Sequence, residues 1–130
     1  MGAAGRAWHD RGMLIRTGRH GHELYTRERV YVTELLNDPA VPQVSLARCR
    51  VLPGVTTELH RLDVAEWYVL EQGRGLMEVG DGAPFPVGPG DVVAIPAGTP
   101  QRITNTGEGD LVLQCVCVPR FTEEGYTPLE

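Results

Sequence analysis

The chain has 130 residues, a formal net charge of −5 and an isoelectric point of about 5.3. This length is enough for one domain built around one hydrophobic core. An acidic balance offers little attraction to nucleic acid or to an anionic membrane, so neither is expected as a partner.

Sixteen glycines and ten prolines interrupt the sequence every few residues. Such frequent turn residues favour many short strands over long helices, and hence an all-β sandwich or barrel. The three cysteines (Cys49, Cys115 and Cys117) are an odd number. With no apolar segment typical of a secretory signal and no run long enough to span a bilayer, the composition predicts a reduced, soluble, cytoplasmic protein.

Residues 1–27 are polar, glycine-rich and basic, and are expected to form a loosely ordered N-terminal arm. From Glu28 onward, residues alternate with the period of a β-strand. Expected strands, bounded by turn signals, cover roughly 28–36, 44–52, 56–62, 66–72, 76–80, 91–96, 101–105 and 111–118. Together they predict a barrel over residues 28–120, followed by a C-terminal tail at 121–130.

The pleat of three of these strands predicts which side chains face the barrel interior, because alternate residues of a strand share a face. The expected inward sets are Thr56, Glu58, His60 and Leu62; then Glu66, Tyr68 and Leu70; then Gln101, Ile103 and Asn105. A carboxylate facing a barrel interior is costly unless it is paired, so Glu66 suggests a functional role. His60, Glu66 and Gln101 are expected to converge on one buried polar site.

A purely structural interpretation of the same residues stays open. His60 could be a barrel histidine hydrogen-bonded to Glu66 or Gln101, and Tyr68 and Leu62 could be ordinary core residues. Trp67 and Val69 fall on the opposite face of their strand, and burial of that apolar face predicts a homodimer.

Two sets of five residues are spaced as in a known protein family. The first segment reads G-x5-H-x-H-x3-E-x6-G and the second G-x5-P-x-G-x2-H-x3-N, with leucine and glutamine in place of two histidines. The positions are Gly54, His60, Leu62, Glu66 and Gly73, then Gly90, Pro96, Gly98, Gln101 and Asn105, where the two substituted positions are Leu62 and Gln101. These two segments resemble the two cupin motifs. The resemblance implies a cupin double-stranded β-helix, or jelly-roll barrel.

Cupins usually hold a divalent metal on three histidines and a glutamate, so the resemblance also implies a metal site. Leu62 cannot bind a metal and Gln101 is a weak neutral ligand. The remaining candidate ligands are His60, Glu66 and Gln101, for a weakly held Zn, Mn, Fe or Ni ion. No organic cofactor is expected.

The chain is also similar to bacterial single-domain cupins of the conserved-barrel type, and to the cupin domains of hydrazine-forming synthetases. This implies an enzyme of secondary metabolism that acts on a small organic molecule in the barrel pocket, with Glu66 and His60 as catalytic groups. Lewis-acid or acid–base chemistry would then support cyclisation, rearrangement or bond formation. Leu62, Tyr68 and Ile103 would line the substrate pocket. The alternative is a non-catalytic binding or sensor protein that has lost its metal.

Overall fold

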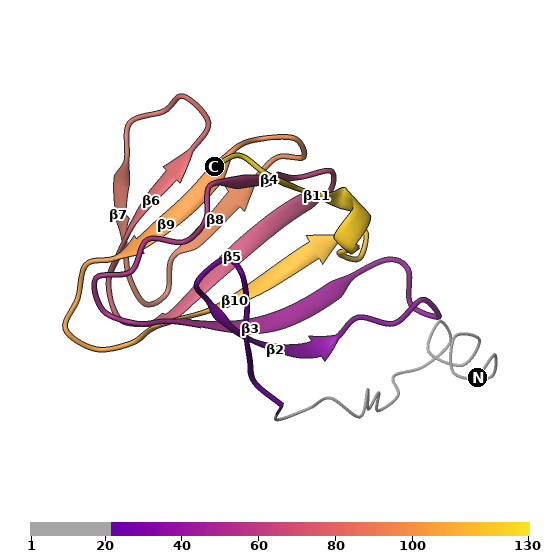
Figure 1. Cartoon of the computed structure of the whole chain (residues 1–130), viewed down its shortest axis with the longest axis horizontal. Helices are drawn as coiled ribbons and strands as arrows, with labels where there is room; N and C mark the ends of the chain where they lie inside the picture. The colour runs from indigo at the N-terminus through magenta and orange to yellow at the C-terminus, as the bar shows by residue number, and fades with distance from the viewer. Residues whose placement is uncertain (1–21) are drawn as a thin grey trace.

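The computed structural model describes residues 22–130, in which two antiparallel sheets form a barrel (Figure 1). The six-stranded sheet has the order β1-β2-β3-β10-β5-β8, and the five-stranded sheet the order β11-β4-β9-β6-β7. The strands of the first sheet are β1 (Leu24–Tyr25), β2 (Tyr31–Leu36), β3 (Ser45–Val51), β10 (Leu111–Val118), β5 (Ala65–Gln72) and β8 (Val92–Ile95). Those of the second are β11 (Tyr126–Pro128), β4 (His60–Leu62), β9 (Gln101–Asn105), β6 (Gly75–Val79) and β7 (Phe85–Val87).

The predicted all-β jelly-roll barrel is confirmed. In the described part of the chain the helical segment is a single 3-10 turn, η1 (Glu123–Gly125). The alternation expected along β5 is also present, because Glu66, Tyr68 and Leu70 are buried while the residues between them are half-buried. No helix in residues 22–130 is long and apolar enough to cross a bilayer.

The strand expected at 56–62 is shorter than its sequence pattern predicts. Only His60–Leu62 pair as β4, and Thr56 makes an isolated bridge to Thr104. The amide of Thr57 donates to Ile103 O and that of Glu58 donates to Glu28 O. Residues 57–59 therefore contact neighbouring segments through single backbone bonds, and the regular strand is confined to its last three residues.

Both ends of the described chain add edge strands to the sheets. β1 pairs with β2, and β11 pairs with β4 through the register of Tyr126 with Leu62. The segment expected as a tail, 121–130, thus contributes a strand, and Glu130 accepts a hydrogen bond from the Leu59 amide. Residues 1–21 of the expected arm lie outside the described residues.

The apolar core is enclosed by strands of both sheets. Met77 and Leu111 are fully buried, and Ile103 and Val51 are nearly so. This packing lies between the two sheets and holds them together.

Asn105, the last residue of the second motif, is buried at the end of β9. Its amide nitrogen donates to Val51 O and Gly109 O, and its side-chain oxygen accepts from the Gly107 amide. Asn105 therefore secures the loop between β9 and β10.

Gly73 turns the chain between β5 and β6 at a position that requires glycine. Its φ is +87°, in the left-handed region, and a Cβ there would lie 2.6 Å from the carbonyl oxygen of Asp110. Gly54 has a similar φ of +79° but open space around a Cβ. Both motif glycines therefore adopt a left-handed backbone conformation that favours glycine, but only at Gly73 would a side chain also clash with the backbone.

We expect Gly73→Ala to lower the free energy of unfolding by about 3 kcal/mol, since it combines left-handed strain with a backbone clash. Gly54→Ala should cost about 1 kcal/mol from strain alone. Gly109→Ala, where a Cβ meets open space, is the control and should change stability by less than about 0.5 kcal/mol. Urea denaturation of the three variants tests this ranking, and equal losses at Gly73 and Gly54 would contradict it.

Candidate functional site

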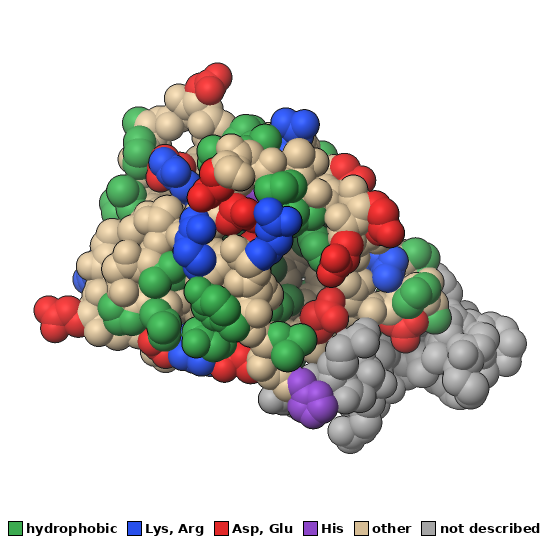
Figure 2. Space-filling view, in the orientation of Figure 1, with side chains coloured by type: hydrophobic (Ala, Val, Ile, Leu, Met, Phe, Trp, Pro, Cys, Tyr) green, Lys and Arg blue, Asp and Glu red, His purple; other side chains and the backbone are tan. Residues whose placement is uncertain are grey.

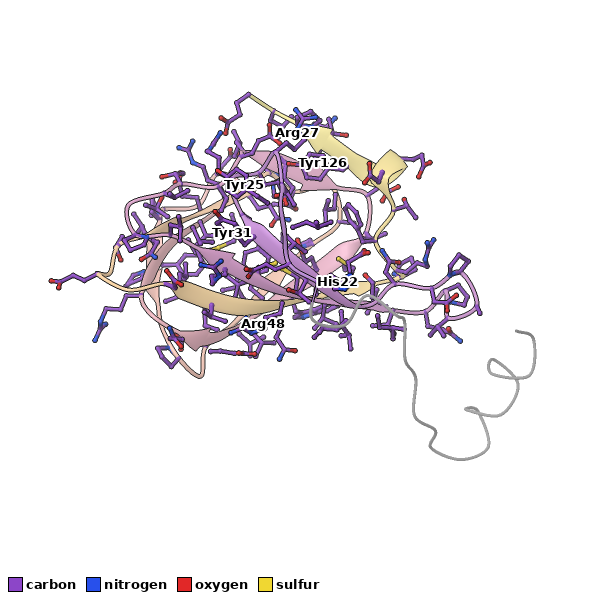
Figure 3. All side chains as sticks on the ribbon, turned by 60° about the horizontal axis from the view of Figure 1, so that its bottom comes forward. His22, Tyr25, Arg27, Tyr31, Arg48 and Tyr126 are labelled. Carbon is purple, nitrogen blue, oxygen red and sulfur yellow. The ribbon has the colours of Figure 1, made fainter. Side chains whose placement is uncertain are left out.

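A cavity of about 500 Å³ opens into the barrel, lined by residues of both sheets and of the two ends of the described chain. His60 and Glu66 lie on its wall, and so do Leu62, Tyr68 and Ile103, the residues expected to form a pocket. Figure 3 shows Arg27 and Tyr126 close together at one end of the segment that carries β1, with His22 at the other end. Both ends of the described chain thus help to enclose this space.

Glu66 lies on β5 with its carboxyl pointing inward, and its side chain is among the buried polar groups. Gln101 Nε2 donates to Glu66 Oε1 at 2.9 Å, and Cys117 Sγ lies 3.8 Å from Glu66 Oε2. Burial raises the pKa of Glu66 to about 7, although the bond from Gln101 opposes that shift. Glu66 can therefore exchange a proton near neutral pH.

Gln101 is enclosed between Glu66 and Tyr68. The Tyr68 hydroxyl donates to Gln101 Oε1 at 2.7 Å, while Gln101 Nε2 faces Glu66. Burial raises the pKa of the Tyr68 hydroxyl well above its usual value, so it stays a hydrogen-bond donor. Gln101, fixed by the Tyr68 hydroxyl, thus orients the Glu66 carboxyl through an uncharged amide.

His60 is the β4 residue directly opposite Gln101 in the five-stranded sheet. Its Nδ1 lies 2.8 Å from the carbonyl oxygen of Glu58. A carbonyl can only accept, so Nδ1 carries the hydrogen, and a neutral ring then presents an unprotonated Nε2. His60 Nε2 lies 3.4 Å from Glu28 Oε2.

Glu28 and Tyr126 are site residues that the sequence patterns did not indicate. Glu28 follows β1 in the turn toward β2, and burial raises the pKa of its carboxyl, while positive charge on His60 opposes that shift. The Tyr126 ring stacks on the His60 ring at 4.7 Å between centroids, and its hydroxyl donates to Glu58 Oε1. Neither residue lies in a spaced motif, and both reach the site through contacts distant in sequence. The aromatic ring in an otherwise polar segment was the one available signal for Tyr126.

The structure buries the three predicted site residues but pairs them in two separate sets. His60, Glu66 and Gln101 are all buried in the barrel interior, but His60 pairs with Glu28 whereas Glu66 pairs with Gln101. The sequence left Glu66 and Gln101 open as hydrogen-bond partners of His60, but the carboxyl beside its Nε2 is that of Glu28, in the turn between β1 and β2.

Three thiols lie close to this site. Cys49, Cys115 and Cys117 all line the cavity as free cysteines, with Cys49 Sγ and Cys115 Sγ 3.4 Å apart. Contact with Cys49 and burial raise the pKa of the Cys115 thiol well above its usual value, and burial raises the pKa of the Cys117 thiol. Both thiols are therefore protonated near neutral pH and act as weakly polar wall groups rather than as nucleophiles.

The residues do not fit the metal site that the motif resemblance implies. Within residues 22–130, no three side chains of the His, Cys, Asp or Glu types are grouped so that they could hold an ion. Gln101 turns its amide nitrogen toward Glu66, and its oxygen is engaged by Tyr68. A metal needs lone pairs directed at one point, and these side chains do not supply them.

Restoring the two missing histidines should restore metal affinity. We expect the double variant Leu62→His, Gln101→His to gain a thermal shift with Zn, Mn, Fe or Ni ions, because it completes three histidines and one glutamate. The wild-type protein should show no comparable shift, and the single variant Gln101→His an intermediate one. A stabilising, stoichiometric metal in chelator-free wild-type protein would contradict this assignment.

The raised pKa of Glu66 makes stability depend on pH with a definite sign. The ordinary pKa of this group is 4.5. Between that pH and about 7 the unfolded chain loses this proton while the folded protein keeps it, so stability falls as pH rises. We expect Glu66→Gln to gain on the order of 3 kcal/mol relative to wild type across this window, as an upper bound.

Urea denaturation of both proteins at a series of pH values tests the effect. The difference between them isolates Glu66 from the other titratable groups around it, which are Glu28 and His60, Tyr68 on the same strand, and Cys115 and Cys117 on β10. A difference that is constant over this pH range would show that Glu66 titrates normally.

Comparisons of the sequence and of the structure with known proteins agree on one family. The family model described as a cupin domain matches residues 47–118. An uncharacterised protein of Methanocaldococcus jannaschii is 37% identical over 109 residues, which cover 81% of this chain and 86% of that protein. A cupin 2 conserved barrel domain protein from Salinispora arenicola is 25% identical, with a TM-score of 0.68 over 83% of this chain and 90% of that one.

Two solved enzymes have the same fold at lower identity. The polyketide cyclase RemF of Streptomyces resistomycificus is 20% identical, with a TM-score of 0.73 over 91% of this chain and 87% of that one. A nucleoside dehydratase of Streptomyces is 15% identical, also with a TM-score of 0.73, over 91% of this chain and 92% of that one.

Proposed function

The chain belongs to the cupin family, and from that premise we propose that it is an enzyme that transfers protons to and from a small organic molecule in the barrel cavity. The observation that carries the proposal is the placement of two proton-exchanging groups, Glu66 and His60, on the wall of one cavity. Similar barrels include a cyclase and a dehydratase, and both names denote reactions of small molecules.

The two groups are suited to complementary roles. Glu66 is buried, with a pKa of about 7, so it can donate a proton in one step and accept it back in another. His60 presents Nε2 as the basic atom because Nδ1 is bonded to a backbone carbonyl. One group removes a proton from the substrate while the other delivers one. The substrate and the two groups together therefore neither gain nor lose a proton, whether the reaction is an elimination, a cyclisation or an isomerisation.

Glu28, Gln101 and Tyr126 support these groups. Glu28 lies 3.4 Å from His60 Nε2 and can hold or relay its proton. Tyr126 fixes the plane of the imidazole by stacking, and Gln101 fixes the Glu66 carboxyl. Groups held in this way need little reorganisation when the proton moves. The residues that would contact the apolar part of the substrate are Leu62, Tyr68 and Ile103.

Proton exchange with solvent offers a test that applies whichever metabolite is the substrate. We expect wild-type protein, incubated in deuterium oxide with a metabolite extract, to change the mass of at least one compound by conversion or deuterium uptake. Glu66→Gln and His60→Gln should each reduce that rate by about 10²-fold or more. Glu108→Gln, at an exposed residue of the β9–β10 loop, should leave it unchanged.

Two results would contradict the proposal. If metabolites bind but none is altered, the protein is a binding or sensor protein, which is the alternative function. If turnover is unaffected by both site substitutions, the chemistry lies elsewhere in the barrel.

The metabolic role, the oligomeric state and the cellular location of the protein also stay predictions. A role in secondary metabolism rests on the sequence likeness to cupin domains of hydrazine-forming synthetases, and the neighbouring genes would test it. A homodimer would bury the half-exposed outer face of β5 that carries Trp67 and Val69. A cytoplasmic location is likewise a prediction.

A further inference from the structure

The cavity wall is rich in carboxyl groups. Among the described residues that line it, four are glutamates and one is an arginine, and the chain contains no lysine. The lining glutamates are Glu28, Glu34, Glu66 and Glu123. Figure 2 shows acidic side chains beside a hollow near the middle of the face it displays.

The arginine does little to neutralise these carboxyl groups when they ionise inside the cavity. Arg27 Nη2 lies 3.2 Å from Glu58 Oε2, and the Arg27 side chain is 64% exposed. Its guanidinium is therefore at the rim, paired with a carboxylate that does not itself line the cavity. Its charge lowers the pKa of Glu28, but by less than His60 and Tyr126 do.

Glu66 in particular has only neutral neighbours as hydrogen-bond donors. Oε1 accepts from the Gln101 amide at 2.9 Å, and the Cys117 thiol lies 3.8 Å from Oε2. A thiol is a weak donor, and this contact is long. Oε2 thus has only weak thiol donors among the side chains around it.

Glu28 supplies a second, half-buried carboxyl to the same space. It lies beside His60 Nε2, and its backbone oxygen is fixed by the bond from the Glu58 amide. The turn that carries it is secured by Arg29, whose Nε donates to Thr56 O at 2.8 Å. Glu28 and Glu66 come from different segments, so the cavity offers a ligand carboxyls on two parts of its wall.

The rest of the wall is largely apolar or aromatic. The Tyr126 ring stacks on His60, and Tyr68, Phe121 and several aliphatic side chains line the same cavity. Such a surface favours a ligand with an aromatic or aliphatic body. A cationic head on that body would complement the carboxyls and could also lie over an aromatic face.

We propose that the cavity binds a protonated amine with an aromatic or apolar body, and that anionic molecules are excluded from it. Such an amine would be the substrate class of the site described above, so the inference rests on the proposed function. The ammonium group would donate to the Glu66 or the Glu28 carboxyl, and either contact would be a charge-assisted hydrogen bond. A carboxylate or phosphate in the same place would face like charge.

A matched set of three indoles tests the inference. Tryptamine, tryptophol and indole-3-acetate share a ring and differ in a positive, a neutral or a negative terminal group. Isothermal titration at about pH 8 and low salt should show tryptamine binding about tenfold or more tighter than tryptophol. Indole-3-acetate should bind more weakly than either.

Variants locate the effect. Glu66→Gln and Glu28→Gln should each reduce the preference for tryptamine over tryptophol by about fivefold or more, with little change in tryptophol binding. Glu108→Gln removes the same charge from an exposed loop outside the cavity lining and should keep the wild-type preference. Thermal melting of each variant establishes that it is folded. If one variant does not fold, the other variant and the binding of the three indoles to wild-type protein still test the inference.

Equal affinity for the three indoles, tighter binding of the indole carboxylate, or no tryptamine binding at millimolar concentration would overturn the inference. A preference retained in both cavity variants would do the same. Because the measured quantity is equilibrium binding, a protein that prefers amines without converting any metabolite would keep this inference while the proposed catalysis fails.

Discussion

A carboxyl group buried in the barrel without a positive charge bonded to it is the constraint on which this site depends. Glu66 is enclosed with a neutral amide and a thiol as its donors, and burial raises its pKa to about 7. Because Glu66 keeps its proton near neutral pH, the protein avoids much of the free-energy cost of burying a charge there. The same environment gives the group a proton that it can transfer, so the constraint and the proposed chemistry have one cause.

The two substituted motif positions have structural consequences that fit this chemistry. Gln101 faces Glu66 and Tyr68 at once, which orients the glutamate without adding charge. Leu62 lies in the cavity wall where a histidine would otherwise add a polar group. His60 keeps a fixed tautomer through a backbone carbonyl. The result is a cupin barrel whose remaining polar residues suit proton transfer better than coordination.

The barrel and its inward faces could be predicted from the sequence because both depend on local rules. The period of β5 placed Glu66 and Tyr68 correctly, and Gly73 marks a turn that no other residue fits. The pairings could not be predicted, since they depend on where distant segments meet. Glu28 reaches His60 through the β1–β2 turn, and Tyr126 reaches it through β11. Both lie at the margins of the expected barrel, where no spacing pattern marks them.

The ionisation of Glu66 is the property whose measurement bears most directly on the proposed chemistry. Carbon-13 NMR titration of protein labelled at the glutamate side-chain carboxyl carbons, compared with Glu66→Gln, would identify its resonance. We expect the resonance missing from the variant to titrate with a pKa of about 7, well above the ordinary value of 4.5. A midpoint at or below that ordinary value would show a carboxylate already ionised near neutral pH, and would contradict the role of Glu66 as a proton donor.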